Sequence, residues 1–81
     1  MEEASNSLIG KTVLNTKGTI IGIIEKSIKD AVSGEIVSVL IKPSKETNLQ
    51  KYTVTELGEI IFPFASLSSV KDVVIIEETL N

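Results

Sequence analysis

Cysteine and histidine are both absent from this 81-residue sequence. Without cysteine there is no disulfide framework and no thiolate that could act as a nucleophile or a metal ligand. Without histidine as well, the chain cannot build a Ser–His–Asp or Cys–His arrangement, a conventional zinc site or a proton shuttle near neutral pH. We therefore predict that the chain is not an enzyme, and we expect no catalytic residue, no cofactor and no bound metal.

Arginine is absent too, and the net charge is −3. A nucleic-acid surface normally clusters positive charge against the phosphates and favours arginine for bidentate contacts. Here the basic residues are lysines that stand singly, at positions 11, 17, 26, 29, 42, 45, 51 and 71. We therefore expect no direct binding of nucleic acid.

Long apolar runs are also missing. The longest have four residues, as in Val73–Ile76, whereas a membrane-spanning helix needs about 20. The first residues, Met1–Ser7, are acidic and polar, unlike the basic and then apolar start of a secretory signal. These features predict a cytoplasmic protein without membrane insertion.

The rest of the chain is organised around Gly18–Glu25, a run of isoleucines interrupted by one glycine. Isoleucine is β-branched and favours a strand over a helix. Regular alternation would place Ile21 and Ile23 on one face of this strand and Ile20, Gly22 and Ile24 on the other. Both faces would be apolar, and a glycine in mid-strand predicts a bulge, a bend or a close approach of two backbones.

Glycine, asparagine and proline divide the remaining chain into short strands. The pattern predicts an all-β fold, a small antiparallel β-barrel of five to six strands, as a single domain over residues 1–81 with loose tails at 1–6 and 78–81. We expect one short helical turn near residues 64–69. Phe62 and Phe64, on either side of Pro63, are expected to plug the core rather than stack on bases. The predicted strands cover residues 11–14, 19–28, 35–42, 59–62 and 73–76, with a possible ragged edge at 52–55.

Aliphatic residues exceed what one small barrel can enclose, and an exposed apolar patch usually marks an interaction surface. We expect the surplus to form a protein interface. An alternative is that residues 43–58 cover this face, and a slip of one residue would exchange the two faces. The predicted interface residues are Ile21, Ile23, Val37, Val39, Ile41, Val74 and Ile76.

Five short glycine and aliphatic motifs occur in an order that resembles the PRC-barrel domain. The resemblance extends over about residues 5 to 77. The length of the chain is similar to that of small stand-alone archaeal members of this family. The motifs are Leu8–Val13, Gly18–Ile24, Gly34–Ile36, Ile60–Pro63 and Asp72–Ile75.

The resemblance implies a barrel of about six strands that serves as an assembly module. It implies protein partners: a second copy, a related PRC-barrel protein in a heterodimer, or a SepF-type membrane anchor. The most concrete version is an adaptor in archaeal cell division that links SepF to the FtsZ ring. Two alternatives are an accessory role in ribosome maturation, as in the family member RimM, and a small-ligand sensor in the mouth of the barrel.

Overall fold

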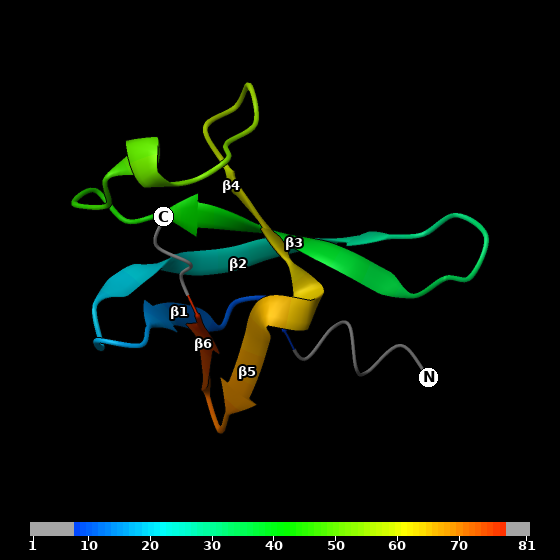
Figure 1. The fold of residues 1–81 in the computed structure, drawn as a ribbon, viewed down its shortest axis with the longest axis horizontal. Helices are drawn as coiled ribbons and strands as arrows, with labels where there is room; N and C mark the ends of the chain where they lie inside the picture. The colour runs from blue at the N-terminus through cyan, green and yellow to red at the C-terminus, as the bar shows by residue number, and fades with distance from the viewer. Residues whose placement is uncertain (1–7, 78–81) are drawn as a thin grey trace.

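The computed structural model describes residues 8–77, so the predicted tails at 1–6 and 78–81 lie outside the described residues. Six strands and two short 3-10 helices make up this part of the chain (Figure 1). The elements are β1 (Thr12–Asn15), β2 (Ile20–Lys29), β3 (Ile36–Pro43), η1 (Leu49–Lys51), β4 (Ile60–Pro63), η2 (Phe64–Ser66), β5 (Leu67–Val70) and β6 (Val73–Ile76). The all-β fold predicted from the sequence is confirmed.

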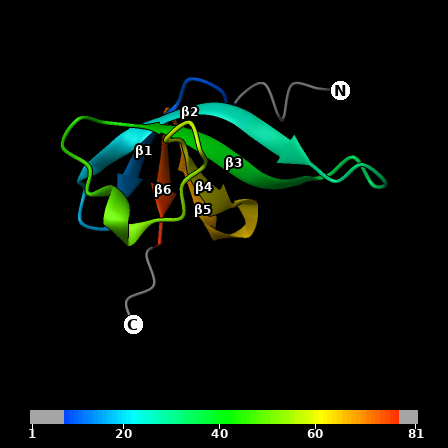
Figure 2. The same cartoon turned by 90° about the horizontal axis from the view of Figure 1, so that it is seen from above.

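The strands form one sheet in the order β4-β3-β2-β1-β6-β5. This sheet curls into a half-barrel (Figures 1 and 2). Four of the neighbouring pairs are antiparallel, but β1 and β6 are parallel. The prediction of a purely antiparallel sheet is wrong on this point, because the β5–β6 hairpin folds back so that its second strand lies beside β1.

The core fills the inside of the curve. Its fully buried side chains are branched aliphatic residues from β1, β2, β3, β4 and β6, and each such burial contributes roughly 1.5–3 kcal/mol. Phe62 packs against this cluster, whereas Phe64 is 39% exposed. The core residues are Leu8, Val13, Ile21, Ile24, Val39, Ile41, Ile60, Val74 and Ile76.

A β-bulge in β2 changes which isoleucines face inward. Val13 of β1 pairs with Gly22, but the next residue, Leu14, pairs with Ile20, so Ile21 is the extra residue. A bulge breaks the simple alternation of side chains. Ile21 and Ile24 both lie in the core, while Ile20 and Ile23 are 55% and 47% exposed. The faces predicted from regular alternation were therefore wrong.

Gly22 lies where two backbones come very close, as the sequence predicted. A Cβ atom built on this residue would overlap the carbonyl oxygen of Lys42 in β3 and lie 2.9 Å from Cγ2 of Ile41. No larger residue fits without moving β3. The glycine therefore allows the tight pairing of β2 and β3 beside the bulge.

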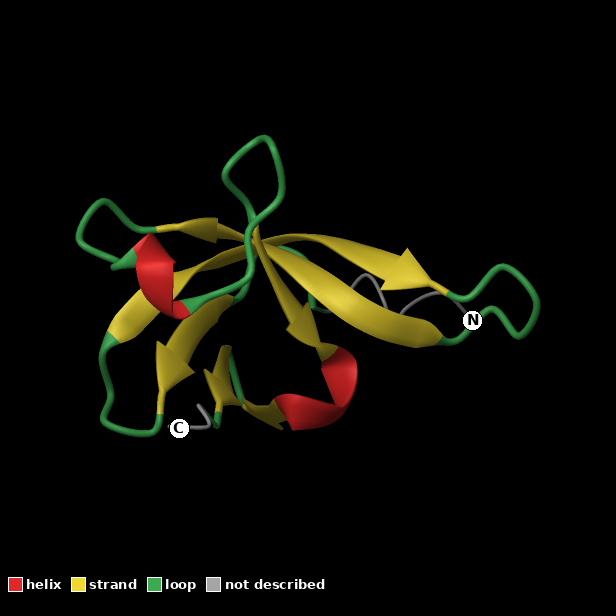
Figure 3. Ribbon diagram, turned by 45° about the horizontal axis from the view of Figure 1, so that its top comes forward, coloured by secondary structure: helices red, strands yellow, loops and turns green. Residues whose placement is uncertain are grey.

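The predicted helical turn at 64–69 is half right. Residues 64–66 form η2, drawn in red in Figure 3, but Leu67–Val70 form the strand β5. All four of these residues pair with β6. A serine-rich stretch with weak strand preference becomes an edge strand here because β6 supplies a backbone partner.

Residues 43–58 extend the edge of the sheet. The amide of Ile61 donates to the carbonyl of Thr53 at 2.9 Å, and the amide of Thr55 donates to that of Glu59 at 2.8 Å. Tyr52 packs against the core cluster. Residues 53–55 therefore run along the outer edge of β4, whereas Ser44 and Thr47 bond to the carbonyl of Ile21 in β2. The strands β2 and β3 form a long hairpin that extends past the curled part of the sheet (Figures 1 and 2).

Candidate functional site

The seven residues predicted as an interface do not form one surface. Five of them belong to the core of this same chain: Ile21, Val39, Ile41, Val74 and Ile76. Ile23 and Val37 are exposed, at 47% and 48%. Val37 lies near the start of β3 in the extended hairpin, while Ile23 pairs with Lys42 at the other end of that strand. Exposed aliphatic residues are present as expected, but the choice of face needs correction because the curled sheet buries most of the predicted residues in its own core.

An exposed aliphatic surface does exist, on the outer side of β2, β1 and β6. Leu14 of β1 lies between Ile20 of β2 and Ile75 of β6 in the strand register. In the next row, Thr12 lies between Ile23 and Val73. We call this surface the outer aliphatic face, and it comprises Leu14, Ile20, Ile23, Val73 and Ile75.

The outer aliphatic face is contiguous across three strands. Ile20 and Ile23 are exposed, and Leu14, Val73 and Ile75 are half-buried. In β6 the burial alternates, with Val74 and Ile76 inside. Regular alternation along β6 therefore predicts that Val73 and Ile75 face outward. The exposure of Ile20 depends on the bulge in β2, which no pattern in the sequence indicates.

Charged residues border this face. Lys42 of β3 pairs with Ile23, and Glu25 follows two residues later in β2. A side-chain hydrogen bond with Glu59, loss of water around the carboxyl group and the negative charge of Glu59 raise the pKa of Glu25, and the positive charges of Lys42 and Lys26 oppose this rise. The two carboxyl groups thus interact across the sheet at the margin of the apolar surface.

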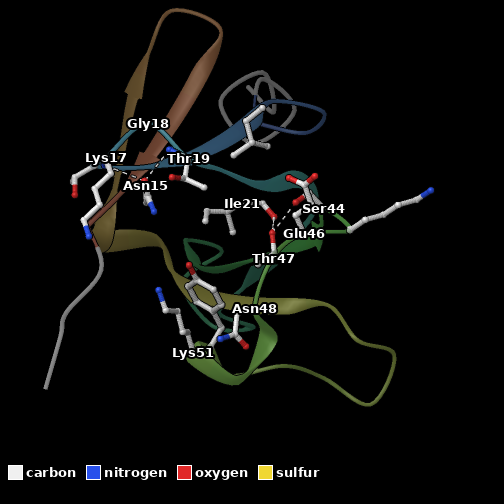
Figure 4. Close-up of a pocket in the computed structure, with 14 residues that line it drawn as sticks. Asn15, Lys17, Gly18, Thr19, Ile21, Ser44, Glu46, Thr47, Asn48 and Lys51 are labelled. Atoms are coloured by element: carbon white, nitrogen blue, oxygen red, sulfur yellow. Dashed lines mark hydrogen bonds between the residues drawn. The ribbon is translucent and has the colours of Figure 1, made fainter.

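A groove of about 940 Å³ lies beside this face, between the β1–β2 turn at residues 15–19 and the segment at residues 44–52 (Figure 4). We call it the hairpin groove. Its lining combines lysines, amides and hydroxyl groups with the apolar side chains of Ile20 and Ile21 and with Tyr52. Among residues 8–77, no group of three or more acidic side chains could hold a metal ion. Within the same range, no helix is long and apolar enough to cross a membrane.

A curled sheet of six short strands, with an aliphatic outer surface and an adjoining groove, defines a small β-barrel domain suited to binding other molecules. The PRC-barrel domain model matches residues 1–80, and the chain belongs to this family. The resemblance inferred from the glycine and aliphatic motifs is confirmed.

One relative is an uncharacterized protein of the archaeon Methanocaldococcus jannaschii. It is 26% identical over 72 residues, which cover 89% of this chain and 78% of the relative. The match therefore extends through most of both chains, and it places a similar domain in an archaeon.

Proposed function

We propose that this PRC-barrel chain is a non-enzymatic interaction module that associates with a second copy of itself through the outer aliphatic face. The observation that carries the proposal is the continuity of that face across β2, β1 and β6. Membership of a family of small barrels that are generally not catalytic supports an interaction role over an enzymatic one.

The shape of the face favours a second copy as the occupant. The two rows of side chains lie on a sheet surface, and two such surfaces pack face to face in β-sandwiches. The same patch on both subunits gives a closed two-fold dimer. A heterodimer with a related PRC-barrel protein would use the same packing.

The finer form of the proposal is an adaptor in a cytoplasmic assembly of archaeal cell division, which links a SepF-type membrane anchor to the FtsZ ring. Its support is the family and the archaeal relative. An affinity pull-down from the native cell, followed by mass spectrometry, tests it. Recovery of small ribosomal particles that survive a high-salt wash, in place of division proteins, would contradict it.

The self-association is tested by analytical ultracentrifugation at micromolar concentration. The Ile23→Asp variant places a charge on an exposed position of the face, so we expect a concentration-dependent dimer for the unmodified chain and a monomer for the variant. Val32→Asp is the matched control, because Val32 is 95% exposed at the tip of the β2–β3 hairpin. An unmodified chain that stays monomeric across the concentration range would refute the proposed dimer.

A further inference from the structure

The wall of the hairpin groove formed by the β1–β2 turn is held in place by its own hydrogen bonds. The Oδ1 atom of Asn15 accepts the amides of Lys17 and Thr19, both at 2.9 Å. The amide of Gly18 donates to the carbonyl of Asn15, also at 2.9 Å, with Gly18 at a φ of 85°. This wall is therefore a defined turn that presents the Lys17 side chain.

The opposite wall is tied to the bulge in β2. The carbonyl oxygen of Ile21 accepts the hydroxyl of Thr47 at 2.7 Å and the amide of Ser44 at 2.9 Å. The hydroxyl groups of Ser44 and Thr47 are 2.8 Å apart and hydrogen-bonded. Both walls are preformed, and a preformed site loses less conformational entropy when it binds.

The lining of the groove has a specific chemical character. Three lysines, at positions 17, 45 and 51, and one glutamate, Glu46, lie among its described lining residues, although the whole chain has a net charge of −3. Figure 4 shows Lys17 and Lys51 toward one end of the groove and Glu46 toward the other. Ile20 is 55% exposed beside them and Tyr52 is half-buried. The groove thus combines a positive end with apolar surface.

We infer that the hairpin groove binds an acidic peptide segment of a partner protein. An aliphatic or aromatic side chain of the segment would pack on Ile20 and Tyr52, and its carboxylates would lie at the end marked by Lys17 and Lys51. The inference goes beyond the proposed self-association and does not depend on it.

Two observations favour a peptide over other anions. The groove volume of about 940 Å³ is near the upper end of the roughly 300–1,000 Å³ usual for small-molecule sites, so the groove has room for a short chain segment. A nucleic acid needs positive charge clustered along its phosphate backbone, whereas this groove has Lys17 and Lys51 at one end and Glu46 at the other.

The probe is a fluorescein-labelled eight-residue peptide of alternating glutamate and leucine, measured by fluorescence anisotropy at low salt. We expect saturable binding that weakens as salt rises, since charge pairs at a surface are screened. The same peptide with glutamine in place of glutamate should bind at least about tenfold more weakly, because it cannot form charge pairs with the lysines.

The variant is the double substitution Lys17→Glu and Lys51→Glu, and we expect it to raise the Kd of the acidic peptide by at least about tenfold. Lys26→Glu with Lys29→Glu is the matched control, because it makes the same charge change on exposed positions of β2 away from the groove. This control should change the Kd by less than about twofold. Thermal melting confirms that each variant folds.

Three results would overturn the inference: no binding of the acidic peptide to the unmodified chain, equal affinity for the glutamine peptide, or an equal loss in the control variant. A single-stranded DNA oligomer that binds more tightly than the peptide at the same salt concentration would also overturn it, in favour of a general polyanion site.

Discussion

At the scale of single residues, small changes in side-chain chemistry decide how closely strands approach and how the surface is charged. Gly22 permits a backbone contact with Lys42 that any Cβ would block. The neighbouring carboxyl group of Glu59 raises the pKa of Glu25, first through a side-chain hydrogen bond and also through its negative charge. The protonation of Glu25 therefore couples the fold to pH.

The pKa of Glu25 in the folded chain is raised above its ordinary value of 4.5, first by the hydrogen bond with Glu59. The folded state therefore binds the proton more tightly than the unfolded chain, and this contribution to stability is present at low pH and is lost as the pH rises through the raised pKa. We predict that Glu25→Gln raises the melting temperature at neutral pH and flattens its dependence on pH just above 4.5.

Melting curves recorded by circular dichroism across this pH range check the prediction. Glu35→Gln, at an exposed position beyond the far end of β2, serves as the control and should leave the pH profile unchanged. A Glu25→Gln variant with the same pH profile as the unmodified chain would show that the carboxyl pair does not affect stability.

At the scale of elements, β3 shows how one strand serves two environments. Val39 and Ile41 are fully buried, whereas Val37, two residues before Val39, is 48% exposed. In the pairing with β2, Ile28 lies opposite Ser38 and Lys29 lies opposite Ile36, so Val37 is an extra residue at a bulge. Ile36 packs against the core in its place. The bulge therefore places Val37 on the surface although regular alternation would put it on the same face as Val39 and Ile41.

Val39→Ala and Val37→Ala make the same chemical change two residues apart in β3. We predict that Val39→Ala lowers the free energy of unfolding by about 2 kcal/mol, from lost burial and the cavity that remains. Val37→Ala should lower it by less than about 0.5 kcal/mol, as is usual for surface substitutions. Urea unfolding measures both, and equal losses would mean that Val37 is covered in solution.

At the scale of the whole molecule, two surfaces lie close together on one half-barrel. The outer aliphatic face covers β2, β1 and β6, and the hairpin groove opens beside the β1–β2 turn. Ile20 belongs to both, whereas Ile23 belongs to the face alone and Lys17 to the groove alone. Ile20 is therefore the residue at which the proposed dimer contact and the proposed peptide contact overlap.

We predict that the two surfaces can be inactivated separately. Ile23→Asp should abolish the dimer while the Kd for the acidic peptide changes by less than about twofold, since Ile23 does not line the groove. The double variant Lys17→Glu and Lys51→Glu should keep the dimer and lose the peptide. Ultracentrifugation measures the dimer and fluorescence anisotropy measures peptide binding on the same samples. If Ile23→Asp abolished peptide binding together with the dimer, a second copy would be needed to complete the groove.

The sequence by itself determined the all-β class, the family and the positions of most strands. Glycine and asparagine end the first strand at Asn15–Gly18, where the structure has its turn, and Val73–Ile76 is the last strand as predicted. These are local properties, because turn chemistry and β-branched runs act within a few residues. The absence of cysteine, histidine and arginine likewise limited the chemistry without any coordinates.

Only the tertiary structure decided which aliphatic residues are inside. The bulge at Ile21 arises from the pairing of β2 with β1, and it turns both Ile21 and Ile24 inward. The strand β5 exists because β6 lies beside it, and β6 runs parallel to β1. The groove lies between residues 15–19 and residues 44–52, and the hydrogen bonds of Ser44 and Thr47 to the carbonyl of Ile21 hold its second wall. Each of these features depends on contacts between distant parts of the chain, which a local pattern of residues does not specify.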